Sequence, residues 1–152
     1  MLIVLFSLLV LTADRVMKIW AMANKPNGSV LIRGVLQLLY TENKGMAFGL
    51  FSGQTWVFAA ISALALGAAF LMAHKFKMNG FCRAALGLAI GGAAGNLIDR
   101  IFLGYVVDMF DFLFVRFAVF NVADAGLTIG TGMLMVAILF MPKAWEVKKQ
   151  CK

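Results

Sequence analysis

Residues 91–100 read GGAAGNLIDR, and this stretch decides the fold. Gly87, Gly91 and Gly95 follow one another at intervals of four, so they share one face of a helix. Small residues on one face let a membrane helix approach its neighbour closely. Asp99 continues the same face, and an acid in a membrane helix needs a partner or a function. The stretch therefore predicts a closely packed helix that points an acid into a bundle.

The composition of the whole chain is that of an integral membrane protein. Of its 152 residues, 62% are hydrophobic and 14% are charged, and its mean hydropathy is +0.91. These values exclude a water-soluble domain of this size and a disordered segment. Four stretches approach the roughly 20 apolar residues that a spanning helix needs. We therefore predict an all-α membrane protein, a single domain over residues 1–152 with a four-helix bundle at about 1–20, 55–74, 84–107 and 117–141.

Two segments in the first third of the chain allow a reading other than a plain membrane helix. The first apolar stretch could instead be a signal peptide, but no basic segment precedes it and no small-residue cleavage site follows it. Residues 23–54 are rich in glycine and turn formers, and the run 30–40 is β-branched and aliphatic. This pattern predicts a small β-element. Because an irregular strand cannot lie in lipid, we expect the β-element at the outer surface or over a cavity there.

The basic residues indicate how the helices are oriented. The loop at 75–83 and the C-terminal tail carry seven basic residues and one acidic residue: Lys75, Lys77, Arg83, Lys143, Lys148, Lys149 and Lys152 against Glu146. The opposite side carries five of each sign. By the positive-inside rule, this loop and both termini are predicted to be cytoplasmic. The basic residues do not form one face with interleaved aromatics, so no nucleic-acid partner is expected.

Acidic residues from three of the predicted helices converge on one depth. Asp14, Asp99 and Asp124 each lie roughly 20 to 26 Å from the cytoplasmic helix ends, and Asp108 follows the third helix near the same boundary. Asp14 and Lys18 are four residues apart. They form either an ion pair that snorkels to the surface or a brace for a site.

The available side chains restrict the chemistry of such a site. The only histidine, His74, is far from the acids, and the chain has two cysteines, so a nucleophilic triad and a four-ligand metal site are both excluded. Two carboxylates that share a site cannot both ionise cheaply, so one can act as acid while the other acts as base on a water. Lys18 or Arg100 could keep the base ionised. A proton-coupled transporter and a non-enzymatic assembly module are the alternatives.

Five ordered motifs carry a resemblance to a known family. They are TADRVMK at 12–18, TENKGMAFG at 41–49, GGAAGNLIDR at 91–100, VVDM at 106–109 and FNVADA at 120–125. The chain resembles the bacterial lipoprotein signal peptidases, or signal peptidase II, over nearly its whole length. The resemblance implies an aspartic protease of the bacterial inner membrane, with four membrane helices and a periplasmic β-cradle.

The same resemblance implies a substrate and a set of residues. The enzyme would need no cofactor or metal and would act as a monomer in contact with membrane lipid. It would cleave a prolipoprotein just before its diacylglyceryl-modified cysteine, near the outer face of the membrane. By position, the catalytic pair is Asp108 and Asp124. The residues that would bind substrate or support the pair are Asp14, Lys18, Asn43, Gly45, Asn96, Asp99, Arg100 and Asn121. Met109 and Ala125, which follow the two aspartates, depart from the commonest pattern without removing a catalytic group.

Overall fold

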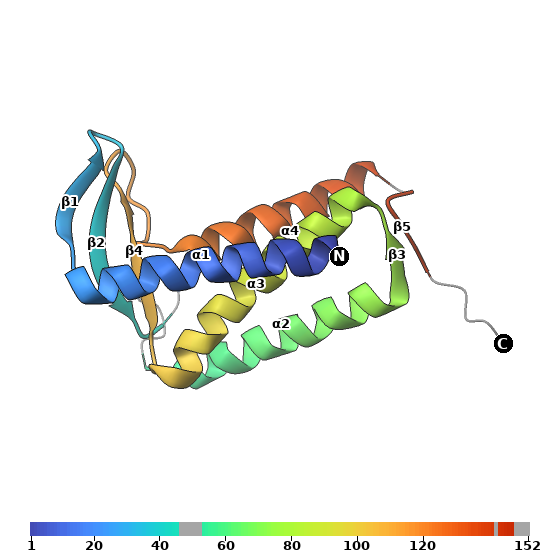
Figure 1. Cartoon of the computed structure of the whole chain (residues 1–152), viewed down its shortest axis with the longest axis horizontal. Helices are drawn as coiled ribbons and strands as arrows, with labels where there is room; N and C mark the ends of the chain where they lie inside the picture. The colour runs from blue at the N-terminus through green and yellow to red at the C-terminus, as the bar shows by residue number, and fades with distance from the viewer. Residues whose placement is uncertain (46–52, 142, 148–152) are drawn as a thin grey trace.

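Four long helices extend from a small sheet at one end of the molecule (Figure 1). The computed structural model describes residues 1–45, 53–141 and 143–147. In this part of the chain the helices are α1 (Leu2–Asn24), α2 (Thr55–Lys75), α3 (Gly80–Phe102) and α4 (Val122–Phe140). Three of them, α2, α3 and α4, are long and apolar enough to cross a membrane. α1 is as long, but three charged residues interrupt it: Asp14, Arg15 and Lys18.

The glycines of α3 allow it to pack closely against α1 and α4. A Cβ atom at Gly87 would lie 2.6 Å from the backbone oxygen of Ile3 in α1. A Cβ atom at Gly92 would meet the backbone oxygen of Ala123 in α4. Glycine is therefore required on both faces, and the small-residue packing predicted from the sequence is confirmed for α3 against α1 and α4.

A three-stranded antiparallel sheet closes one end of the helices. Its strands are β1 (Asn27–Ile32), β2 (Leu36–Asn43) and β4 (Val106–Phe112), in the order β1-β2-β4. β1 and β2 confirm the β-element predicted between the first two helices. Their turn contains Gly34 at φ 73°, a conformation that favours glycine. In the register of β2 and β4, Thr41 lies opposite Asp108.

The structure corrects the predicted limits of the third and fourth helices. α3 ends at Phe102 instead of 107, because Gly104 turns the chain at φ 78° and the following residues pair with β2. α4 begins at Val122 instead of 117, because Phe120 exchanges backbone hydrogen bonds with Phe110. The sheet therefore includes a strand from between α3 and α4, and Asp108 lies on that strand.

The opposite end of the bundle carries a second, smaller sheet, which the sequence analysis did not predict. β3 (Phe76–Met78) pairs antiparallel with β5 (Trp145–Val147). The N-terminus of α1 lies at this same end (Figure 1). An apolar core lies beside the two strands and includes Met78, Cys82 and Leu86.

Candidate active site

The N-terminus of α4 places Asp124 in the first turn of that helix. Asn121 is the N-cap, and its side-chain oxygen accepts a hydrogen bond of 2.8 Å from the backbone N–H of Asp124. In return, one carboxylate oxygen of Asp124 accepts a 3.2 Å bond from the backbone N–H of Asn121. This reciprocal capping box fixes the Asp124 carboxylate at the end of the helix.

Strand β4 places Asp108 beside that helix end, with only 1% of its surface exposed. Its two carboxylate oxygens accept hydrogen bonds from different side-chain amides. Asn121 donates to one oxygen at 2.6 Å, and Asn43 of β2 donates to the other at 3.0 Å. The backbone N–H of Gly45 donates to Asn43 at 3.0 Å, which fixes the direction of that amide.

Asn96 of α3 connects the two aspartates to a buried lysine. Its amide nitrogen donates to Asp124 at 2.7 Å. Its oxygen accepts from Lys18 at 2.9 Å and from Asn121 at 3.2 Å. The carboxylates of Asp108 and Asp124 therefore belong to one continuous hydrogen-bond network.

Both carboxylates line a cavity of about 240 Å³. Asn43, Gly45 and Arg100 contribute to its polar side, and Phe117–Phe120 and Val106 to its wall. A second cavity of about 290 Å³ shares Arg100 and Asp124 with the first and is lined mainly by apolar side chains: Phe58, Ile61, Ala65, Ala93 and Leu127. The polar cavity can hold a peptide bond and a water, and the second offers space for an apolar group.

The environment of Asp108 raises the pKa of its carboxyl into the neutral range. Burial raises the pKa of its carboxyl from an ordinary 3.8 to about 7, and the nearby charge of Asp124 adds to the rise. The hydrogen bonds from Asn43 and Asn121 and the charge of Lys18 oppose it. A pair of carboxyl groups that holds one proton near neutral pH has the property needed for general acid and base catalysis.

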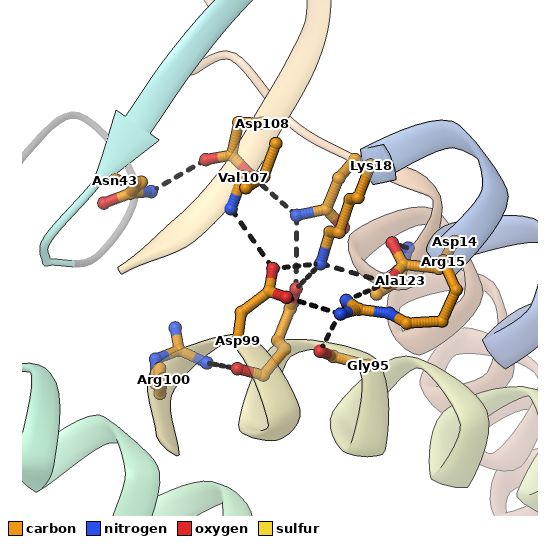
Figure 2. Close-up of polar contacts among 12 residues, drawn as sticks. Asp14, Arg15, Lys18, Asn43, Gly95, Asp99, Arg100, Val107, Asp108 and Ala123 are labelled. Carbon is orange, nitrogen blue, oxygen red and sulfur yellow. Dashed lines mark hydrogen bonds and ion pairs between the residues drawn. The ribbon is translucent and has the colours of Figure 1, made fainter. Parts of the chain in front are cut away.

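A cluster of four charged side chains, which includes Lys18 and Asp99, lies next to Asp108 (Figure 2). Lys18 contacts Asp14 at 3.0 Å and Asp99 at 2.7 Å. Arg15 contacts the same two carboxylates at 2.8 and 2.7 Å. Asp14 and Lys18 are fully buried, so the ion pair does not snorkel to the surface. Of the two expectations for this pair, the structure supports the brace.

The structure brings the ten predicted site residues to one end of the bundle. Arg15 is the cluster member that the sequence analysis missed. A charged residue adjacent to Asp14 in an apolar run was the available signal. The last residues of the second motif, 46–49, lie outside the described residues. Within the described part of the chain, no group of three or more acidic, histidine or cysteine side chains could hold a metal ion.

Comparisons with known proteins place the chain in a family. The family model described as signal peptidase (SPase) II matches residues 6–140. A lipoprotein signal peptidase of Latilactobacillus sakei subsp. sakei (strain 23K) is 38% identical over 146 residues, which are 94% of this chain and 97% of the relative. One of Clostridioides difficile (strain 630) is 39% identical over 142 residues, 92% and 96% of the two chains.

Two solved structures, each described as a bacterial membrane enzyme, share the fold. One superposes with a TM-score of 0.83 at 30% identity and covers 99% of this chain and 94% of its own. The other has a TM-score of 0.80 at 32% identity, with coverage of 91% and 93%. The arrangement of helices and sheet described above is therefore shared with known membrane enzymes.

Proposed function

Because this chain belongs to the signal peptidase II family, a group of bacterial inner-membrane proteases that remove signal peptides from prolipoproteins, we propose that Asp108 and Asp124 are its catalytic residues. The observation that carries the proposal is the shared cavity, where the buried carboxylate of Asp108 and the partly buried carboxylate of Asp124 face the same space. The transporter alternative has no support from the two relatives described above, each of which is named as a lipoprotein signal peptidase.

The proposed reaction uses one proton on the pair. The ionised carboxylate takes a proton from a water, and the water oxygen attacks the scissile carbonyl carbon. The protonated carboxyl donates its proton to the carbonyl oxygen, which gives a tetrahedral diol. As the C–N bond breaks, the other carboxyl gives the leaving nitrogen the proton it took from the water. The proton of one diol hydroxyl returns to the first carboxylate, which restores the pair with one proton. The raised pKa of Asp108 supports this carboxyl as the one that holds the proton at neutral pH. The pair titrates as a unit, so the apparent values in an assay belong to both groups.

The proposed substrate carries a diacylglyceryl group on the cysteine that follows the scissile bond. The second cavity supports this proposal, since its apolar walls from α2, α3 and α4 meet the polar cavity at Arg100 and Asp124. An acyl chain could occupy the apolar space while the peptide bond lies between the aspartates. Arg100 and Asn43 line the polar cavity, where they would orient the peptide backbone or the lipid head group.

We also propose how the enzyme lies in the membrane. α1 is the fourth spanning helix, and its charged residues are accommodated because Asp14 and Lys18 are buried against α3. The three-stranded sheet forms the cradle at the outer face. Lys75 and Lys77 lie at the other end, beside the N-terminus, which supports a cytoplasmic location for that end. One chain holds both aspartates, which supports a single domain that acts as a monomer.

The experiment that tests this function is cleavage of a diacylglyceryl-modified prolipoprotein peptide by the purified protein in detergent. We expect a cut just before the lipidated cysteine, no cut in the unlipidated peptide, and no activity in Asp124→Asn. Asp111→Asn is the matched control, because Asp111 pairs with Gln37 at 2.7 Å on the far part of β4 and does not line the cavity. Activity that survives in Asp124→Asn, or is lost equally in Asp111→Asn, would contradict the assignment.

A further inference from the structure

The residues immediately before the two aspartates are held in the same way. The backbone N–H of Val107, next to Asp108, donates to the carboxylate of Asp99 at 3.2 Å. The backbone N–H of Ala123, next to Asp124, donates to the carboxylate of Asp14 at 3.0 Å. Two buried acids that are not in the cavity therefore each hold the main chain beside one catalytic acid (Figure 2).

Lys18 joins these two anchoring acids. Its ammonium group lies 3.0 Å from Asp14 and 2.7 Å from Asp99, and all three side chains are fully buried. Its remaining contact is the 2.9 Å bond to the side-chain oxygen of Asn96. An ammonium has three donors, and these three acceptors use all of them. Rotation of the group cannot improve one contact without weakening another.

The third contact also fixes the direction of the Asn96 amide. An ammonium only donates, so the oxygen of Asn96 must face Lys18 and its NH₂ must face away. That NH₂ is the donor to Asp124 at 2.7 Å. With the amide reversed, its NH₂ would face the ammonium and its oxygen would face the carboxylate, and both contacts would be repulsive. Lys18 thereby selects the orientation in which Asp124 receives a hydrogen bond.

We propose that Lys18 is a positioning residue that sets the spacing and orientation of Asp108 and Asp124 through three arms. One arm runs through Asp14 to the main chain at Ala123, one through Asp99 to the main chain at Val107, and one through Asn96 to the Asp124 carboxylate. The inference rests on the proposed catalytic pair. It adds a role to Lys18, which does not itself line the cavity that holds the two aspartates.

The three arms start at Lys18 and end on different elements, so this one residue can fix the position of those elements relative to one another. Asp108 is on a strand and Asp124 is on a helix, and a shift of about 1 Å between them would cost roughly 100-fold in rate. The ammonium contacts side chains of α1 and α3. Those side chains in turn bond to β4 and α4. The charged groups that face the pair from the packed elements are Asp14, Arg15 and Lys18 of α1 and Asp99 and Arg100 of α3.

The test compares Lys18→Met with Lys77→Met. Both remove one lysine charge with the same replacement, but Lys77 is exposed on β3 at the other end of the molecule. For Lys18→Met we expect kcat to fall roughly 100-fold while KM for the lipidated peptide changes little. We also expect the fall in activity above pH 7 to move to higher pH, because the lost charge no longer lowers the pKa of Asp108. Lys77→Met should match the wild-type protein.

Two results would overturn the proposal. One is a folded Lys18→Met protein with kcat within about threefold of wild type. The other is a loss in which KM rises and the pH profile keeps its position, which indicates general loosening of the bundle. If Lys18→Met does not fold, Lys18→Gln is judged by the same criteria, because its amide keeps a donor without the charge. The proposed function is tested separately. It is upheld if the wild-type protein cleaves the peptide and Asp124→Asn does not, whatever the result for the Lys18 variants.

Discussion

The two halves of α3 contact the same neighbours through different chemistry. In the half near β3, Gly87 and Gly91 contact the backbone of α1 at Ile3 and Ser7. In the half near the three-stranded sheet, Asn96 and Asp99 contact polar and charged side chains of α1 and α4. The first contact is mainly close backbone packing, with a hydrogen bond of 3.0 Å from the Ser7 hydroxyl to the backbone oxygen of Gly87. The second contact is dominated by polar and charged side chains.

This difference separates the sources of stability and activity. Close backbone packing stabilises a membrane bundle, where lipid competes poorly with a well-fitted surface. Buried charges and paired carboxylates add little stability and demand a fixed geometry. We therefore expect substitutions near the sheet to change activity first and substitutions in the glycine half to change stability first.

The largest loss of activity should come from a substitution of Asp108, which lies on β4. Asp108→Asn removes one of the two carboxyl groups and should lower kcat by about 10²- to 10⁴-fold or more. Its volume is unchanged, and helix packing lies elsewhere, so the protein should remain folded and inserted. Peptide cleavage and thermal unfolding in the same detergent measure both properties. If Asp108→Asn unfolded with its activity per folded molecule intact, the separation between the two halves would be wrong.

A substitution in the half of α3 near β3 should lower stability and leave activity nearly unchanged. In Gly87→Ala the new Cβ would lie 2.6 Å from the backbone oxygen of Ile3 and 2.9 Å from the Cβ of Phe6, so α1 must move. We expect a loss of about 1 to 3 kcal/mol in unfolding free energy, with near-normal activity in the molecules that stay folded. Thermal unfolding in detergent measures the loss.

Gly132→Ala is the matched control for this packing effect. Gly132 lies in α4, and a Cβ atom there would have no neighbour within 4 Å. Since alanine is the better helix former, we expect no loss and a gain of up to about 1 kcal/mol. Equal losses in Gly87→Ala and Gly132→Ala would mean that contact with α1 is not the cause.

Sequence alone predicted the features that depend on local spacing. The glycine face follows from positions four apart in a helix, and it is present. The convergence of Asp14 and Asp99 follows from the rise per residue along the predicted helices, and Lys18 contacts both acids. The strand character of 106–112 was missed, because it depends on pairing with β2, more than sixty residues earlier in the chain. β3 and β5 were missed for a related reason. Strands of three residues carry too short a pattern to recognise.

The candidate site could also be predicted only in part. The acids were recognised because a charged side chain in a membrane helix is energetically costly, but their hydrogen-bond partners could not be predicted. The bonds from Asp14 and Asp99 to the main chain at Ala123 and Val107 join segments far apart in sequence, and no residue pattern encodes them. Arg15 was missed because its chemistry matches that of an arginine that reaches the membrane surface. In the fold it meets two acids instead.

The dependence on pH should be confined to the half of α3 near the three-stranded sheet. Activity requires one proton on the pair, and the pKa of Asp108 is raised to about 7 by burial and by Asp124. The proton is therefore retained below pH 7 and lost above it, so kcat/KM should fall up to about tenfold for each pH unit above 7. No titrating group takes part in the contact of Gly87 with Ile3 and Phe6, so the stability difference between Gly87→Ala and wild type should be the same at pH 6 and pH 8. A flat activity profile from pH 6 to 9 would contradict a proton held on this pair, and a packing loss that changed with pH would contradict the independence of the two halves.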